Sequence, residues 1–181
     1  MSGVPVKPRR WIEVVLFMLV GFITIGVPII PMGLAANSIG FPDVMFAVFA
    51  AWVIRRPVSA PIVGIVFFGV LADALMMRPL GLWALVLFVG MELLRLSERA
   101  FRDIPFVLEW LYVSGLFALM LLLQNVLLFV SFDSVYILSD VIWHWVRTVL
   151  SYPSVVLVLH WVLRIRAYKK DNRPNRLGYV L

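Results

Sequence analysis

Residues 61–77 read PIVGIVFFGVLADALMM, an apolar run that contains one charged side chain, Asp73. Nine of these residues are Ile, Val, Phe or Leu, and each favours insertion into a bilayer by about 0.3–0.6 kcal/mol. Their sum of about 3–5 kcal/mol offsets the roughly 2.5–3.5 kcal/mol that a central aspartate costs. Asp73 also lies near one end of the run, where its cost is lower. The segment is therefore predicted to form a membrane-spanning helix despite its carboxylate.

The whole chain has a composition like that of this segment. Of its 181 residues, 63% are hydrophobic and 14% are charged, and its mean hydropathy is +1.01. Soluble domains average about 45–50% apolar and about 25% charged residues, and a small protein has too much surface to hide such an excess. We therefore expect an all-α integral membrane protein. Because the chain has no cysteine, disulfides, thiol nucleophiles and cysteine-ligated metals are excluded.

Apolar runs suited to crossing a bilayer, which takes about 17–25 residues, recur along the chain. They predict a compact bundle of about six transmembrane helices over residues 11–30, 41–54, 61–77, 80–96, 104–130 and 141–162. The second run is short, about 21 Å as a helix. It requires a locally thinned bilayer, an extension into the apolar residues before it, or a re-entrant arrangement.

The basic residues indicate how the bundle is oriented. Six spans place 14 of the 16 Lys and Arg residues on one side, with Arg78 and Arg147 on the other. Cytoplasmic loops carry an excess of basic residues, so both termini are predicted to be cytoplasmic. The net charge of +6 then reflects topology, not binding to nucleic acid. The chain divides into a cytoplasmic segment (1–10), a transmembrane domain (11–164) and a basic cytoplasmic tail (165–181) suited to anionic lipid.

Asp73 is open to two interpretations. In the first, it is a carboxylate tolerated at the membrane interface. In the second, it faces neighbouring helices, because Gly69 lies four residues earlier on the same helix face and lets another helix approach closely. Arg78 and Arg147 are the basic residues expected on this side, and either could pair with Asp73. The spacing favours the second interpretation.

Other polar residues lie at the ends of the apolar runs. Pro42 and Asp43 suit the start of the second helix, and residues 55–57, Arg-Arg-Pro, suit a cytoplasmic stop and turn. The sequence shows no nucleophile beside a base, no phosphate-binding loop, no set of residues at metal-ligand spacing and no series of acids for a proton relay. Neither an enzyme nor an ion pump is expected, and no cofactor is predicted.

Residues 41–85 combine these features in a fixed order, FPD…AAWVIRRPVSAPIVGIVFFGVLADALMMRPLGLWAL, and this order resembles the MreD family of bacterial rod shape-determining proteins. In that family, Pro-Asp or Pro-Asn opens a span that ends in Trp and basic or Pro-containing residues. A Gly-containing span with one Asp and then a Leu-Gly turn follow. The matching positions here are Pro42, Asp43, Trp52, Arg56, Pro57, Gly64, Gly69, Asp73, Leu80 and Gly81. The first and last runs match in length, hydropathy and topology only.

The resemblance implies a non-enzymatic scaffold, located in the bacterial inner membrane, of the machinery that builds peptidoglycan during cell elongation. The expected partners are MreC, a single-span protein with a periplasmic domain, then RodA with its transpeptidase partner, and the actin-like MreB. The family's fold looks like that of the substrate-binding subunits of energy-coupling-factor vitamin transporters, so such a small-molecule-binding subunit is the alternative. Many of those subunits carry Ala-x-x-x-Ala in the first span. Residues 11–30 contain no alanine, which favours the scaffold.

Overall fold

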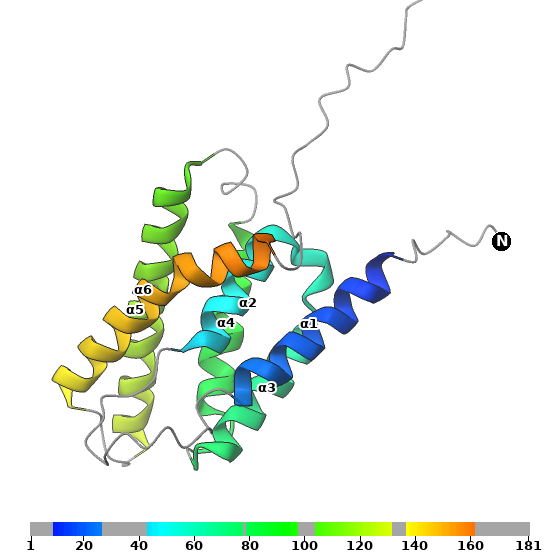
Figure 1. Ribbon diagram of the computed structural model, residues 1–181. Helices are drawn as coiled ribbons and strands as arrows, with labels where there is room; N and C mark the ends of the chain where they lie inside the picture. The colour runs from blue at the N-terminus through cyan, green and yellow to red at the C-terminus, as the bar shows by residue number, and fades with distance from the viewer. Residues whose placement is uncertain (1–8, 27–42, 78, 98–103, 132–136, 162–181) are drawn as a thin grey trace, which may run out of the picture.

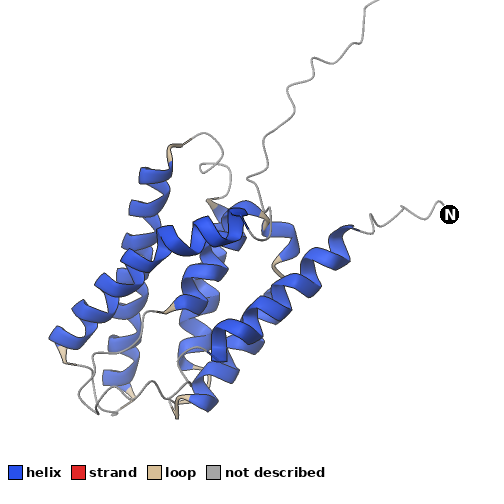
Figure 2. Cartoon of the chain, viewed as in Figure 1, coloured by secondary structure: helices blue, strands red, loops and turns tan. Residues whose placement is uncertain are grey.

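The computed structural model describes residues 9–26, 43–77, 79–97, 104–131 and 137–161, and this part of the chain contains helices but no strand (Figure 2). Its elements are α1 (Arg9–Gly26), α2 (Val44–Arg55), the short 3₁₀ helix η2 (Pro57–Ser59), α3 (Ile62–Leu75), α4 (Leu82–Leu96), α5 (Phe106–Val130) and α6 (Leu138–Trp161). Each α-helix coincides with one of the six predicted runs, with its ends shifted by a few residues. The all-α fold class is confirmed.

Two of the described helices, α5 and α6, are long and apolar enough to cross a membrane. The apolar parts of α1, α2 and α3 are shorter within the described residues. Both long helices come from the second half of the chain, where the predicted runs were also the longest. Membrane insertion of these two helices therefore agrees with the composition of the chain.

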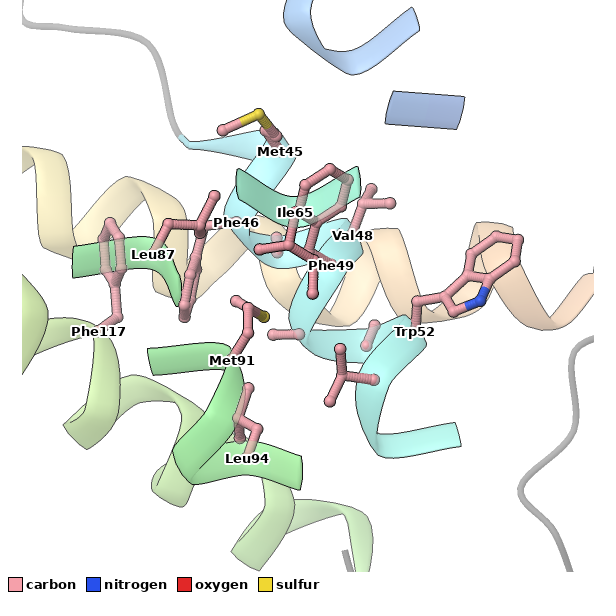
Figure 3. Close-up of a cluster of buried hydrophobic side chains, with 14 of the residues drawn as sticks. Met45, Phe46, Val48, Phe49, Trp52, Ile65, Leu87, Met91, Leu94 and Phe117 are labelled. Atoms are coloured by element: carbon pink, nitrogen blue, oxygen red, sulfur yellow. The ribbon is translucent and has the colours of Figure 1, made fainter. Parts of the chain in front are cut away.

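The short helix α2 lies at the centre of the bundle (Figure 1). Residues 45–53 are all buried, and α1, α4 and α6 pack around them. The Phe46 ring stacks on Phe117 of α5, as Figure 3 shows, and Phe49 contacts Phe17 of α1. Because protein encloses α2, its length does not have to match the hydrocarbon thickness of a bilayer. This enclosure explains why the second run is shorter than a lipid-facing span.

Helix α6 runs obliquely across the bundle, and a proline interrupts its hydrogen bonding (Figure 1). Pro153 has no N–H, so the carbonyl oxygen of Val149, four residues earlier, lacks its usual helical donor. Trp110 of α5 replaces that donor, because its Nε1 donates to this oxygen at 2.9 Å. In the opposite direction, Trp145 Nε1 of α6 donates to the carbonyl oxygen of Ser114 on α5, also at 2.9 Å. The two indoles therefore join α5 to α6.

Replacing Trp110 with phenylalanine is expected to lower the free energy of unfolding by about 1–2 kcal/mol, because the Val149 carbonyl then loses its donor. The control is Pro153→Ala, which gives that carbonyl a backbone N–H within its own helix. Trp110→Phe should therefore cost less in the Pro153→Ala background. Denaturant unfolding of the four proteins in detergent measures both costs. Equal costs in the two backgrounds would show that the hydrogen bond is unimportant.

Candidate functional site

Asp73 lies in the last turn of α3 and is fully buried. Its Oδ2 accepts a hydrogen bond from the backbone N–H of Gly81 at 2.9 Å and a longer one from Ala84 at 3.3 Å. Gly81, at φ +89°, is the N-cap of α4 and has no side chain that could accept a bond from the helix. Asp73 therefore caps a neighbouring helix, with its negative charge at the positive end of the α4 dipole.

The Asp73 side chain is enclosed against α4, which agrees with the interpretation that it faces a neighbouring helix, and its depth in a membrane stays a prediction. Gly69 makes this close approach possible, since a Cβ at Gly69 would lie 2.6 Å from the Cα of Ala84. Neither of the two arginines that were predicted as partners of Asp73 is confirmed as one. Arg78 lies outside the described residues, and Arg147 lies on α6, which packs mainly on α2 and α5. An ion pair between Asp73 and an arginine stays a prediction.

Asp43 is the N-cap of α2, so the predicted helix start is confirmed. Its Oδ1 accepts a hydrogen bond from the backbone N–H of Phe46 at 2.8 Å. Its own backbone N–H donates to Oγ1 of Thr148 on α6 at 2.9 Å. Pro42 lies outside the described residues. Asp43 therefore both starts the central helix and attaches that start to α6.

The other end of α2 carries two adjacent arginines that bind different helices. Arg55 is buried, and its Nη2 lies 3.0 Å from Oε1 of Glu109 on α5. Tyr152 of α6 donates to the same carboxylate oxygen at 2.6 Å. Arg56 pairs instead with Glu13 of α1, with 3.4 Å between Nη1 and Oε1. The end of α2 is thus joined to α5 and α6 on one side and to α1 on the other.

Residues 55–57 were predicted to form a cytoplasmic stop and turn; α2 does end there, and the two arginines in addition form ion pairs with α5 and α1. Glu109 and Tyr152 were not among the residues that the sequence pattern indicated as functional. Glu109 did carry a signal, because it is the only charged residue in the run 104–130, and a carboxylate in such a run needs a partner. Its partner Arg55 is on a different helix, at no helical spacing from it. The sequence therefore indicated the need for a partner but not the identity of that partner.

Further contacts gather at this end of the bundle. Arg95 of α4 donates from Nη2 to the carbonyl oxygen of Ala60 at 2.7 Å and lies 3.0 Å from Glu92. Ser59 Oγ donates to Oε2 of Glu13 at 2.9 Å. We call the set of side chains that make these contacts the polar end: Glu13, Arg55, Arg56, Ser59, Glu92, Arg95, Glu109 and Tyr152. It connects α1, α2, α4, α5 and α6.

The residues that resemble the MreD pattern do not form one site. Trp52 is fully buried and packs edge-on against Phe17, with 5.5 Å between ring centroids, and Figure 3 shows it at one end of the core cluster. Arg56 follows one turn later, at the polar end. Asp43 lies at the start of α2 and Asp73 lies near the end of α3, so both lie at the helix ends that are far from the polar end. The pattern therefore places residues at both ends of the bundle, where they start, cap or join helices.

In the described part of the chain, the charged side chains of the polar end form ion pairs, two of which hold helices together. The carboxylates of the polar end, Glu13, Glu92 and Glu109, each contact an arginine of the same chain. No group of three or more His, Asp or Glu side chains in the described ranges could hold a metal ion. A crevice of about 10 Å³ between α2, α5 and α6, lined by residues such as Phe46 and Val113, has room for about one water molecule.

Comparisons with known proteins do not assign the chain to a family. No family model, curated protein or solved structure matches it. The inference of function therefore rests on the pattern of residues 41–85 and on the contacts just described.

Proposed function

We propose that this protein is a non-enzymatic, multi-pass scaffold of the bacterial inner membrane that serves cell elongation and binds MreC and the associated wall synthases. The observation that carries the proposal is the ordered pattern over residues 41–85, which resembles the MreD family. The contacts of these residues explain why they occur in this order, because each one starts, caps or brings together the helices of the bundle. Asp43 starts the central helix, Gly69 lets α3 and α4 approach, and Asp73 caps α4. In these contacts the residues of the pattern organise helix packing, which supports a scaffold.

In this proposal all six helices lie in the membrane and the polar end faces the cytoplasm. Helices α1 and α5 begin, and α2, α4 and α6 end, toward the same side of the bundle (Figure 1), where the predicted cytoplasmic basic residues cluster. Exposed tryptophans, which favour membrane interfaces, lie near both ends of α6, at Trp143 and Trp161. The helix between them is about 27 Å long, close to the roughly 30 Å of a hydrocarbon core.

The alternative, a vitamin-type binding subunit, agrees less well with α1. The coupling contact of such subunits often uses small residues on the first helix. Here the outward side chains of α1 are large: Trp11, Ile12, Val15, Leu19, Phe22 and Ile23. This bulky surface does not offer the close backbone approach that alanines allow, so the scaffold is the better supported function.

Affinity capture tests the proposal. The tagged full-length protein is purified from membranes in mild detergent, and the captured proteins are identified by mass spectrometry. Enrichment of MreC, with RodA, its transpeptidase partner and MreB, over an unrelated tagged multi-pass protein supports the scaffold. Enrichment of ATP-binding-cassette subunits instead would support the transporter alternative and overturn the proposal.

A cysteine introduced at Val58 is expected to react with a membrane-impermeant maleimide only after the membrane is opened, because η2 lies on the proposed cytoplasmic side. Val58 is 67% exposed, whereas its neighbour Ser59 is buried and would not report topology. The chain has no native cysteine, so the label reports one position. Met77, 95% exposed after α3, is the matched position for the other side. Met77→Cys should react in intact cells, and the reverse pattern would contradict the orientation.

A further inference from the structure

The two adjacent arginines at the end of α2 differ in how fully they are bound. Arg55 is buried, and its guanidinium donates to the carbonyl oxygen of Ala51 and pairs with Glu109, both at 3.0 Å. The Arg56 side chain is 29% exposed. Within the described ranges, its guanidinium has a single polar contact, the 3.4 Å ion pair with Glu13, and its Nε has no hydrogen-bond partner. Charge-assisted hydrogen bonds are usually about 2.7–2.9 Å long, so Arg56 retains donors for an anion from outside the chain.

Exposed apolar side chains lie close to Arg56 in the chain. Val58 in η2 is 67% exposed, and Val63 in the first turn of α3 is 80% exposed. The start of α1 lies at the same end of the bundle as the connection from α2 to α3 (Figure 1). There Trp11, of the residue type that favours membrane interfaces, is 68% exposed. An incompletely bound cation therefore lies at the same end of the bundle as apolar side chains that the described chain leaves uncovered.

A phospholipid combines the two chemical groups that this arrangement complements. Its phosphate lies at the membrane interface, and its acyl chains begin directly below. A guanidinium binds phosphate through parallel N–H donors, and basic sites between membrane helices on the cytoplasmic side bind lipid head groups. The acyl chains would cover Val58 and Val63, whereas a free phosphate ion gains nothing from these side chains. The combination of charge and apolar surface therefore favours a lipid over an inorganic anion.

We propose that Arg56, Val58 and Val63 form a binding site for one membrane phospholipid, with the phosphate on the Arg56 guanidinium and the acyl chains on the two valines. The inference rests on the membrane placement and orientation in the proposed function, and not on the identity of the wall-synthesis partners. It is separate from the basic tail (165–181), which was predicted to attract anionic lipid by its charge.

Native mass spectrometry tests the site. The full chain is purified in detergent and titrated with phosphatidylglycerol, and the occupancy of the first bound lipid is measured. Arg56→Gln is expected to lower this occupancy severalfold. The matched control is Arg147→Gln on α6, which removes the same charge from the side of the bundle opposite to the predicted basic side and should bind lipid as the native chain does. Native occupancy in Arg56→Gln, or an equal loss in the control, overturns the proposal.

Glu13→Gln separates lipid binding from the packing role of the ion pair. Ser59 Oγ donates to Glu13 Oε2 at 2.9 Å and holds this carboxylate beside Arg56, where it competes with a phosphate. Glu13→Gln and Arg56→Gln break the same ion pair, so an effect on packing alone would lower lipid occupancy in both. We expect Glu13→Gln to bind at least as much lipid as the native chain. A loss equal to that of Arg56→Gln overturns the lipid site.

Two further measurements identify the ligand and separate this inference from the proposed function. Excess inorganic phosphate is expected to leave the bound lipid in place, and displacement by it would show a site for free phosphate and overturn the lipid. Labelling of Val58→Cys reports the orientation, and capture of MreC by Arg56→Gln reports the scaffold. Failure of the lipid site is therefore distinguishable from failure of the proposed function.

Discussion

Replacing Glu109 with leucine is expected to lower the free energy of unfolding by about 3–5 kcal/mol, because it leaves a buried guanidinium, which keeps its bond to the Ala51 carbonyl, without a carboxylate to balance its charge. The Arg55 side chain is only 9% exposed, and its Nη2 lies 3.0 Å from the Glu109 carboxylate. The Tyr152 hydroxyl donates to the same carboxylate and would lose its acceptor as well. Leucine fills much of the glutamate volume, so the loss reports the polar contacts and not an empty cavity.

A double-mutant cycle separates the ion pair from other effects. Arg55→Leu combined with Glu109→Leu is expected to recover much of the loss, because both charges are then removed together. Glu92→Leu is the control. Its partner Arg95 is more exposed and keeps its bond to Ala60, so the expected cost is about 0–1 kcal/mol. Denaturant unfolding in detergent is measured for the native protein, the single variants Arg55→Leu and Glu109→Leu, the double variant and Glu92→Leu. If the double variant is no more stable than Glu109→Leu, the ion pair is not the cause.

Asp73→Leu is expected to insert into the membrane at least as well as the native protein, yet to unfold more readily by about 2–4 kcal/mol. Insertion improves because leucine favours the bilayer and aspartate opposes it. Stability falls because the backbone N–H groups of Gly81 and Ala84 lose a buried acceptor at the start of α4. Insertion and folding should therefore change in opposite directions, which an argument from hydropathy alone does not predict.

Asp73→Asn separates the charge from the hydrogen bonds. The amide oxygen can still accept from Gly81, so the expected cost is the smaller loss of a charge at a helix N-terminus, about 0.3–1 kcal/mol. Under the proposed scaffold function, Asp73→Leu should reach the membrane in cells but capture less MreC and fail to restore rod shape, whereas Asp73→Asn should be less impaired. Equal unfolding midpoints for Asp73→Leu and the native protein, with full capture of MreC, would show that the α4 cap is dispensable.

The short run at residues 41–54 shows which features of a helix hydropathy predicts and which it does not. Its apolar residues predicted a helix, and Asp43 predicted where that helix starts; both agree with α2. The burial of residues 45–53 was not predictable, because hydropathy does not distinguish a surface that meets lipid from one that meets other helices. Two of the three ways of accommodating the short run, a thinned bilayer and an extended helix, assumed that α2 itself had to match the bilayer. Its position inside the bundle removes that requirement.

Over the described residues, the sequence by itself determined the six α-helices, their approximate ends and the all-α class, because helix formation depends on neighbouring residues a few positions apart. It also indicated that Asp73 and Gly69 share one face. Only the tertiary structure decided what that face meets, and it decided that the Tyr152 hydroxyl and Glu109, 43 residues apart in the chain, share a hydrogen bond. Such contacts depend on how helices cross, and the crossing results from side-chain packing among all of them. No local spacing in the sequence records that geometry.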